Sequence, residues 1–256
     1  MSQIVWLSSY PKSGNTFVRF LLANYFFDGI SSSAGVDKRI PSIKRVLSHG
    51  IQPQAMIGSR VIVKTHFLST RHPLVKETET AGFIYVVRNP RDVLLSNSRY
   101  SGVTGNKPID AARFAREFIQ HMGVPRWRTE NFGSWPEHVA SWLSAAPRIP
   151  HIFVRYEELK QNTREELTRI LLFLGEQPTE IKLERALAYS SLDAMKRMEQ
   201  KEKATNTMSG VFGDQGMDNY FVGQGNSGQS LKYLGDDIEH EFVARFGGLM
   251  TMLGYS

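Results

Sequence analysis

One stretch near the start of the chain decides the predicted fold: Ile4-Val5-Trp6-Leu7-Ser8-Ser9-Tyr10-Pro11-Lys12-Ser13-Gly14-Asn15-Thr16. Its first five residues form an apolar run that is typical of a buried β-strand. A turn that contains Pro11 and Gly14 follows, and the apolar pattern of residues 16–27 then predicts a helix. A strand that passes directly into a helix indicates the α/β class, in which the two alternate.

The turn between this strand and this helix is suited to bind an anion. It directs free backbone N–H groups and the positive end of the helix at one point. Lys12 adds a full positive charge, and Ser13, Asn15 and Thr16 add hydrogen-bond donors. Phosphate binding is therefore one interpretation, and an ordinary capped helix after a proline turn is the other.

Three further runs of β-branched or aromatic residues predict buried strands over residues 61–64, 83–87 and 152–155. Helical patterns cover residues 91–100, 134–145 and 163–174; Asn162 or Thr163 caps the last of these and Gly175 ends it. This alternation predicts an α/β fold, with one domain over residues 1–256 and a central parallel sheet flanked by helices in a P-loop-like architecture. The irregular stretches 102–108 and 205–230 are expected to be lids or binding loops.

Composition narrows the possible functions. The chain has 256 residues, of which 41% are hydrophobic and 22% charged, as in an ordinary globular protein. The absence of cysteine excludes disulfides, thiol nucleophiles and cysteine-ligated metals, and no helical pair of histidines four residues apart suggests a metal site. The net charge of +6 is compatible with nucleic acid, an anionic membrane or one pocket for an anionic small molecule. No apolar run approaches the ~18 residues of a membrane helix, and the N-terminus lacks a signal-peptide pattern, so we expect a cytoplasmic protein.

Charged side chains follow the second and third predicted strands. Lys64 and His66 follow residues 61–64, and Arg88 follows residues 83–87. Ligands of open α/β sheets bind at the carboxyl ends of the strands, so these side chains are expected to converge on the Lys12 loop. His66 is then the natural general base, since a histidine titrates near neutral pH; a half-buried structural histidine is the alternative.

Two departures from the Walker pattern argue against magnesium-dependent phosphoryl transfer. Lys12 precedes Gly14 instead of following the second glycine, and Arg88 stands where a Walker B strand ends in the aspartate that holds Mg²⁺. A sulfuryl group carries less negative charge than a phosphoryl group. Lysines and a histidine can therefore stabilise its transfer without a metal.

Taken together, these segments resemble the sulfotransferases that use 3′-phosphoadenosine 5′-phosphosulfate (PAPS). Residues 10–17, YPKSGNTF, are similar to the family's 5′-phosphosulfate loop, YPKSGTTW. Residues 88–93, RNPRDV, followed by Ser96, resemble its 3′-phosphate motif, and Lys64-Thr65-His66 resembles the K-[ST]-H that supplies its base. Residues 133–142 and 154–160 resemble its GSWxxHV and RYEDLK stretches, so the similarity covers most of the chain in the family's order.

The resemblance implies a role for each matching residue. His66, Lys12 and Lys64 are the implied catalytic residues, and Lys12 through Thr16 hold the 5′-phosphosulfate. Phe17 replaces the tryptophan that stacks on adenine. The remaining implied nucleotide contacts are made by Arg88, Ser96, Tyr156, Ser190, Leu192, Gln224 and Gly225.

One loop departs from the family pattern. Where the family has RKGxxG, this chain has GQGNSG at residues 223–228, so two cations that grip the 3′-phosphate are missing. The glycines can still direct backbone amides at the anion, and Lys232, Arg197 or Lys201 are candidates to replace the cations. The family's KxxxTVxxxE dimer motif has no match near residues 232–239, and the oligomeric state stays open.

The resemblance implies sulfation of a small-molecule acceptor, a metabolite or natural product, at a hydroxyl or an amine. No metal, membrane or nucleic-acid partner is expected. A P-loop nucleotide kinase and a basic nucleic-acid-binding domain are the alternatives, although the basic residues form no stripe with interleaved aromatics.

Walls of the acceptor pocket are expected from residues 28–60, 102–108 and 205–230. The histidines other than His66 have surface or structural roles by default, with His138 as an exception to watch because its segment can border the acceptor pocket in the family. Six aromatic or methionine residues there indicate either a partly apolar acceptor or core packing: Met56, Met208, Phe212, Met217, Tyr220 and Phe221.

Overall fold

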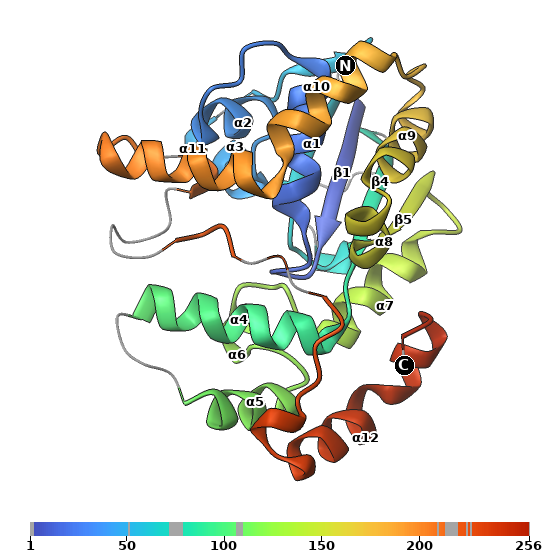
Figure 1. The fold of residues 1–256 in the computed structure, drawn as a ribbon. Helices are drawn as coiled ribbons and strands as arrows, with labels where there is room; N and C mark the ends of the chain where they lie inside the picture. The colour runs from blue at the N-terminus through green and yellow to red at the C-terminus, as the bar shows by residue number, and fades with distance from the viewer. Residues whose placement is uncertain are drawn as a thin grey trace.

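β1 (Gln3–Ser9) forms the middle of a five-stranded sheet with the order β2-β3-β1-β4-β5 (Figure 1). The other strands are β2 (Ala55–Ile57), β3 (Arg60–Thr65), β4 (Thr80–Val87) and β5 (His151–Arg155). This computed structural model describes residues 3–50, 52–71, 79–105, 110–208, 210–212, 220–223, 225 and 227–255. All neighbouring strands are parallel except β2, which pairs antiparallel with β3. The predicted α/β class is confirmed, with the short edge strand β2 as an addition.

The register aligns the carboxyl ends of the parallel strands at one edge. Ser8 of β1 pairs with Thr65 of β3, Ser9 pairs with Val86 of β4, and Val87 pairs with Arg155 of β5. Because β3 and β4 flank β1 on either side, the segments that follow these three strands emerge next to one another. The predicted convergence of the strand ends is therefore a consequence of the strand order.

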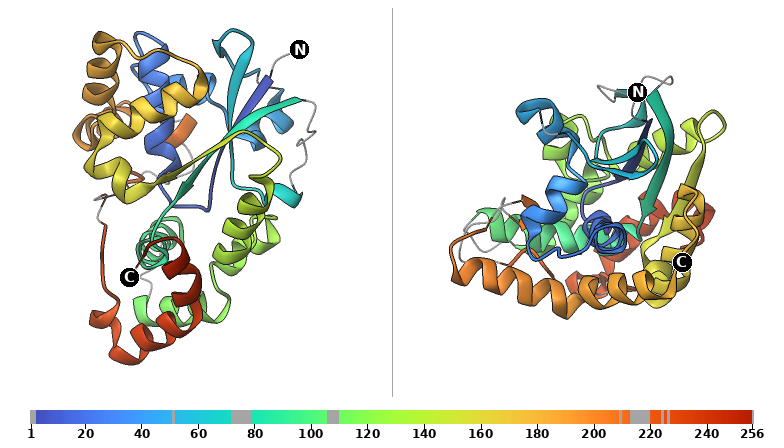
Figure 2. Two further views of the ribbon diagram at one scale, coloured as in Figure 1. Left: turned by 90° about the vertical axis from the view of Figure 1, so that its right-hand side faces the viewer. Right: turned by 90° about the horizontal axis from the view of Figure 1, so that it is seen from above.

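Helices cover both faces of the sheet (Figures 1 and 2). The element bounds are α1 (Asn15–Phe26), α2 (Ser33–Arg39), α3 (Ile43–His49), α4 (Pro90–Gly105), α5 (Ala111–Gln120), α6 (Pro125–Thr129), α7 (Trp135–Ala145), α8 (Tyr156–Gln161), α9 (Thr163–Leu174), α10 (Glu180–Ser190), α11 (Leu192–Ala204), α12 (Asp236–Met252), and the 3₁₀ turns η1 (Ser69–Arg71), η3 (Gly210–Phe212) and η4 (Lys232–Leu234).

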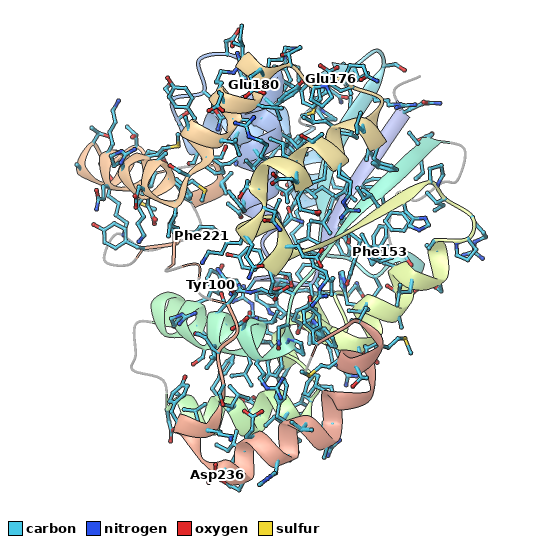
Figure 3. The ribbon with its side chains drawn as sticks, turned by 45° about the vertical axis from the view of Figure 1, so that its right-hand side comes forward. Tyr100, Phe153, Glu176, Glu180, Phe221 and Asp236 are labelled. Carbon is cyan, nitrogen blue, oxygen red and sulfur yellow. The ribbon has the colours of Figure 1, made fainter. Side chains whose placement is uncertain are left out.

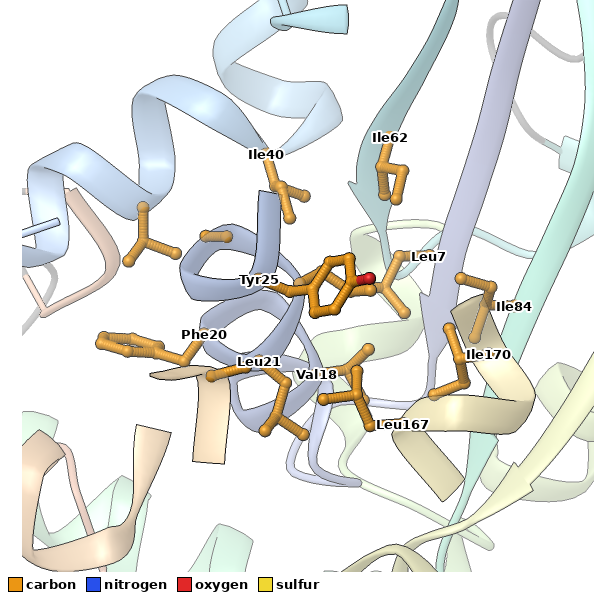
Figure 4. Packing of buried hydrophobic residues seen from close by; sticks show 14 of the residues in the cluster. Leu7, Val18, Phe20, Leu21, Tyr25, Ile40, Ile62, Ile84, Leu167 and Ile170 are labelled. Atoms are coloured by element: carbon orange, nitrogen blue, oxygen red, sulfur yellow. The ribbon is translucent and has the colours of Figure 1, made fainter. Parts of the chain in front are cut away.

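The period-two alternation of the strands divides the core into two clusters. Val5 and Leu7 of β1 pack on one face with α1, α9 and α10, as Figure 4 shows for Leu7, Val18 and Ile170. Trp6, between them in sequence, is fully buried on the other face with α4, α7 and α12. A strand buried on both faces reads as a continuous apolar run, which explains why residues 4–8 carry no polar alternation.

Two predicted segments differ in the structure. α4 runs from Pro90 to Gly105, so the stretch predicted to be irregular over residues 102–108 begins as helix; residues 106–109 lie outside the described residues. α9 begins at Thr163 with Asn162 at its N-cap, but no side chain makes a cap hydrogen bond there. Gly175 ends α9 with a positive φ of 85°, as predicted. Among the helices that the structure describes, none is long and apolar enough to cross a membrane.

Candidate active site

The loop after β1 curls back toward the start of α1. Lys12 and Gly14 have φ angles of 71° and 101°, both in the left-handed region, on either side of Ser13. Gly14 is required there, because a Cβ at this position would lie 2.3 Å from Cδ2 of Tyr156. α1 begins at Asn15, so the loop presents the free N-terminus of a helix of twelve residues.

Two polar side chains of this loop, those of Ser13 and Asn15, are buried. Ser13 is fully buried, and its hydroxyl has no hydrogen-bond partner among the described residues. Burying an unpartnered hydroxyl is costly, and Ser13 is absent from the lining of the cavity around this loop. Asn15 behaves differently, because its side-chain amide donates to the carbonyl of Leu7 and to the Ser9 hydroxyl. Its donors therefore fix the loop to β1.

The ammonium of Lys12 lies between two aromatic rings. Its Nζ is 4.3 Å from the ring centre of Tyr100 on α4 and 4.5 Å from that of Phe221. Figure 3 labels both residues, with Tyr100 on α4 and Phe221 just above it. Burial and, to a smaller extent, the nearby cations Arg88 and Arg99 lower the pKa of Lys12 to about 8, while Glu199 opposes the shift. Lys12 is thus held charged at neutral pH in a position that favours an incoming anion.

Arg88 is attached to the same loop. Its Nη1 donates to the carbonyl of Lys12 at 2.9 Å, and its guanidinium lies 4.3 Å from the ring centre of Tyr156. Tyr156, the first residue of α8, in turn packs against Gly14. Three segments that are distant in sequence therefore form one stacked unit around the loop.

The imidazole of His66 is oriented by a backbone carbonyl of β1. Its Nδ1 lies 2.6 Å from the carbonyl oxygen of Ser9, so Nδ1 carries the hydrogen and Nε2 keeps the lone pair. Burial, followed by the nearby charge of Lys64, holds the pKa of His66 well below its usual value. At neutral pH this histidine is uncharged and able to accept a proton at Nε2.

His138 is hydrogen-bonded to the backbone of His66 and does not line the cavity. Its Nε2 lies 3.0 Å from the carbonyl oxygen of His66, and its Nδ1 lies 2.8 Å from the hydroxyl of Tyr85. The hydroxyl therefore donates to Nδ1 and Nε2–H donates to the carbonyl. Burial lowers the pKa of His138 to about 3, so it stays neutral. The structural role that is the default for such a histidine therefore fits His138, which is fully buried and absent from the cavity lining.

One cavity of about 1090 Å³ unites most of the predicted site residues. Its lining includes Lys12, Gly14, Asn15, Thr16, Phe17, Lys64, His66, Arg88, Ser96, Tyr156, Leu192 and Gly225. Ser190 is placed elsewhere: its fully buried hydroxyl accepts a hydrogen bond from Asn24, which does not support a contact with adenine. Gln224 lies outside the described residues, as does Met217.

The cavity also contains residues that sequence reasoning missed. Arg99 and Tyr100 extend α4 past Ser96, and a second group comes from the segment around α6: Arg126, Trp127, Glu130 and Phe132. Lys44 and Arg45 of α3 also line the cavity; they belong to residues 28–60, an expected wall of the acceptor pocket, although the sequence singles out neither of them. These residues match no motif, and nothing in their local sequence points to the site. Of the residues that the sequence suggested for the acceptor walls, Tyr220 and Phe221 line the cavity. Phe212 is fully buried in the core, and Met56 and Met208 pack against it.

The replacement cations suggested for the 223–228 loop are not at the cavity in the described part of the chain. Lys232, Arg197 and Lys201 are absent from its lining, whereas Arg99 lines it. Lys160 of α8 donates to the carbonyl of Gly225. Two backbone amides that follow, at Gly228 and Gln229, donate to the buried carboxylate of Asp92 at the start of α4. The loop is therefore anchored to α4 and α8.

The fold and this site together define an α/β protein with a cationic pocket at the carboxyl ends of its parallel strands, and comparison with known proteins identifies the family. The sulfotransferase domain family matches residues 2–253, and the chain belongs to this family. Human sulfotransferase 1E1 is 30% identical over 200 residues, which cover 74% of this chain and 65% of the relative. Guinea-pig (Cavia porcellus) sulfotransferase 1E1 is 28% identical, again over 74% of this chain, and 64% of its own length is matched. The chain thus spans less than two thirds of these relatives.

Solved structures share the fold. Mouse sulfotransferase SULT7A1, complexed with PAP, aligns with a TM-score of 0.73 at 22% identity over 97% of this chain and 84% of its own. Retinol dehydratase, in complex with androsterone and the inactive cofactor PAP, aligns with a TM-score of 0.66 at 17% identity over 96% of this chain and 80% of its own. These likenesses establish the sheet architecture of the family.

Proposed function

We propose that this protein is an enzyme that transfers the sulfuryl group of PAPS to a hydroxyl or an amine of a small metabolite or natural product. One observation carries the proposal. The loop with Lys12 follows β1, His66 follows the neighbouring strand β3, and both line the same cavity. His66 is bonded to the carbonyl of Ser9, and Arg88 to that of Lys12. Family membership and the PAP that was solved with two proteins of this fold support PAPS as the donor.

The loop residues would hold the donor. The backbone amides at the start of α1, with Lys12, Ser13 and Thr16, would bind its 5′-phosphosulfate, and Arg88 with Ser96 its 3′-phosphate. Phe17, Tyr156, Leu192 and Gly225 would contact the adenosine; they all line the cavity. Arg99 lines the cavity and acts on the charge of Lys12, which makes it a candidate for one of the two cations that the 223–228 loop lacks.

The reaction needs a group that accepts a proton and cations that stabilise the negative charge of the transition state. Nε2 of His66 takes the proton of the acceptor hydroxyl while a bond forms between that oxygen and sulfur. The bond between sulfur and the bridging phosphate oxygen breaks, and adenosine 3′,5′-bisphosphate leaves. Lys12 and Lys64 stabilise the negative charge that develops on the bridging oxygen and on the sulfuryl oxygens, a role that fixed cations fill well in a water-poor site. A cytoplasmic location and the absence of a nucleic-acid or membrane partner stay predictions.

A binding and turnover experiment distinguishes this proposal from its alternatives. Adenosine 3′,5′-bisphosphate should bind with micromolar or better affinity in calorimetry, without added Mg²⁺, and Arg88→Met should weaken it about tenfold or more. A nucleotide kinase would instead consume ATP only with Mg²⁺. A nucleic-acid-binding domain would bind DNA with an affinity that falls steeply with salt. Tight ATP binding without binding of the bisphosphate would overturn the proposal.

The lowered pKa of Lys12 predicts how nucleotide binding depends on pH. Since this pKa is about 8, the ammonium is charged below pH 8 and loses its proton as the pH rises above it. The affinity for adenosine 3′,5′-bisphosphate should therefore be highest near pH 7 and fall by about tenfold or more toward pH 9.5. The control is Lys12→Arg, which keeps its charge throughout this range and should bind with a nearly constant affinity. A parallel decline of both proteins in calorimetry would rule out Lys12 as the titrating group.

A further inference from the structure

Part of the cavity wall beside the candidate base is cationic. Lys44 and Arg45 of α3 and Arg126 of α6 line the same cavity as His66, and we refer to these three residues as the cationic wall. The ring of Phe132 lies between this wall and His66. The ring centre of Phe132 lies 5.6 Å from that of His66, and Nζ of Lys44 lies 4.9 Å from the Phe132 ring centre.

Two carboxylates lie beneath the cationic wall, and each is shared by two cations. Glu130 accepts from Lys44 and from Arg126, while Asp37 accepts from Arg45 and from the buried Arg19. Each cluster therefore keeps a net charge of +1. Although burial acts to raise it, the pKa of Glu130 is held below its usual range by Lys44 and Arg126, so this carboxylate stays ionised and paired.

The exposure of these groups places the cations outermost. The side chains of Lys44, Arg45 and Arg126 are 55%, 40% and 63% exposed, against 23% for Glu130 and 6% for Asp37. A molecule that enters the cavity therefore meets the ammonium and guanidinium groups before either carboxylate. A cationic acceptor would be repelled, and a wholly apolar one would remove water from the exposed cations without adding a charge to the one carboxylate that each pair of cations shares.

Aromatic surfaces lie between the cations and the base. Phe132 is buried between Lys44 and His66, and Trp127 lies under Arg126, whose guanidinium is 4.9 Å from the indole ring centre. These rings can pack against the body of a small molecule. The arrangement thus offers a base at one end, an apolar middle and positive charge at the other end.

We propose that the acceptor is an anion: a hydroxylated small molecule whose carboxylate, sulfate or phosphate ester binds to the cationic wall while its hydroxyl lies at His66. This inference rests on the sulfotransferase activity proposed above and specifies its substrate class. The charged group sits one ring away from the hydroxyl, because Phe132 separates Lys44 from His66.

Two pairs of probes that differ in one charge test this proposal. The first pair is 3-(4-hydroxyphenyl)propanoate and its amide, and the second is the methyl glycosides of glucuronic acid and glucose. Their dissociation constants are measured by calorimetry on protein saturated with adenosine 3′,5′-bisphosphate, and their turnover is measured with PAPS. In at least one pair the acid should bind about tenfold more tightly than its neutral partner, and this ratio should shrink as salt is added. The cationic phenol tyramine should bind more weakly than either phenol of the first pair.

Charge variants connect the preference to the cationic wall. Lys44→Gln and Arg126→Gln should each lower the acid-to-neutral ratio about threefold to tenfold, whereas Glu130→Gln should raise it because the substitution removes a negative charge. The matched control is Arg164→Gln. Arg164 lies on α9, outside the cavity lining, and pairs with Glu180 and Glu184. Its substitution also removes one positive charge from a glutamate-paired side chain, and it should leave the ratio unchanged.

The outcomes separate the two proposals. If adenosine 3′,5′-bisphosphate fails to bind, the proposed function fails and the charge proposal fails with it. If the bisphosphate binds but neither acid is preferred, only the charge proposal is overturned. A preference for tyramine that Glu130→Gln abolishes would show instead that Glu130 recognises an amine. A ratio that Arg164→Gln lowers as much as Lys44→Gln would assign the effect to net charge and not to the cationic wall.

Discussion

Replacement of His66 by alanine should lower kcat about 100-fold or more while leaving the affinity for adenosine 3′,5′-bisphosphate within about threefold of the unmodified protein. The reason is geometric. Among the residues that the structure describes, the imidazole is hydrogen-bonded only through Nδ1, to the carbonyl of Ser9, so the substitution removes the proposed base at Nε2 without removing a group that would bind phosphate. Turnover with PAPS and calorimetry with the bisphosphate measure the two effects separately.

The pH profile provides a second test of the same residue. Because burial and Lys64 hold the pKa of His66 well below 6.5, the base is deprotonated at neutral pH, and activity should be lost only as the pH falls through this lowered value. The value of kcat/KM should therefore show no decline around pH 6.5, where an ordinary histidine becomes protonated. His66→Ala should abolish the acid limb. A variant with near-normal turnover, or one that retains the limb, would exclude His66 as the base.

Replacement of Gly14 by alanine should weaken nucleotide binding about 100-fold and reduce stability by about 2–4 kcal/mol. Two effects add at this position. A residue with a Cβ is strained at a φ of 101°, and the new methyl carbon would lie 2.3 Å from Cδ2 of Tyr156. The ring of Tyr156 would have to move, and with it the guanidinium of Arg88 that lies on its face.

Gly29→Ala is the matched control for Gly14→Ala. Gly29 has a φ of 67°, and a Cβ there would meet nothing within 4 Å. It should therefore lose only about 1 kcal/mol of stability, from backbone strain, and none of its nucleotide affinity. Thermal unfolding and calorimetry of the two variants give the comparison. Equal losses in both would mean that backbone strain alone explains the result and that Tyr156 is not held against the loop.

The parts of this protein that could be predicted from sequence are those in which local pattern and tertiary position agree. The run at residues 4–8 lies in a strand that is buried on both faces, and its apolar sequence predicts that strand. Gly175 ends α9 because the position requires a left-handed backbone conformation, which glycine adopts readily. Lys12, His66 and Arg88 could be grouped for a general reason: they follow strands of one parallel sheet, and such strands end at one edge. The three-residue strand β2 carries too little pattern to be found.

The residues that could not be predicted owe their position to long-range packing. Glu199 and Glu202 lie in a strongly polar stretch of α11 that resembles a solvated helix surface, yet both are buried. Their carboxylates accept hydrogen bonds from backbone N–H groups of other segments, Glu199 from Phe221 and Val222 and Glu202 from Ser33. Likewise, Lys44 meets Glu130 across 86 residues of sequence. Periodicity within one helix reports which face is apolar, and it carries no information about such distant partners.

The hydrogen bond between His66 and the carbonyl of Ser9 bears on how this protein would acquire new acceptors. The proposed base is attached to the central strand, next to the loop that would bind the donor, whereas the cationic wall belongs to the short helices α3 and α6. Substitutions on these two helices can change which molecules enter without disturbing the alignment of base and donor. The chemistry and the choice of acceptor are therefore separable parts of one cavity, and exchanging α3 and α6 between relatives is a route to altered selectivity at constant mechanism.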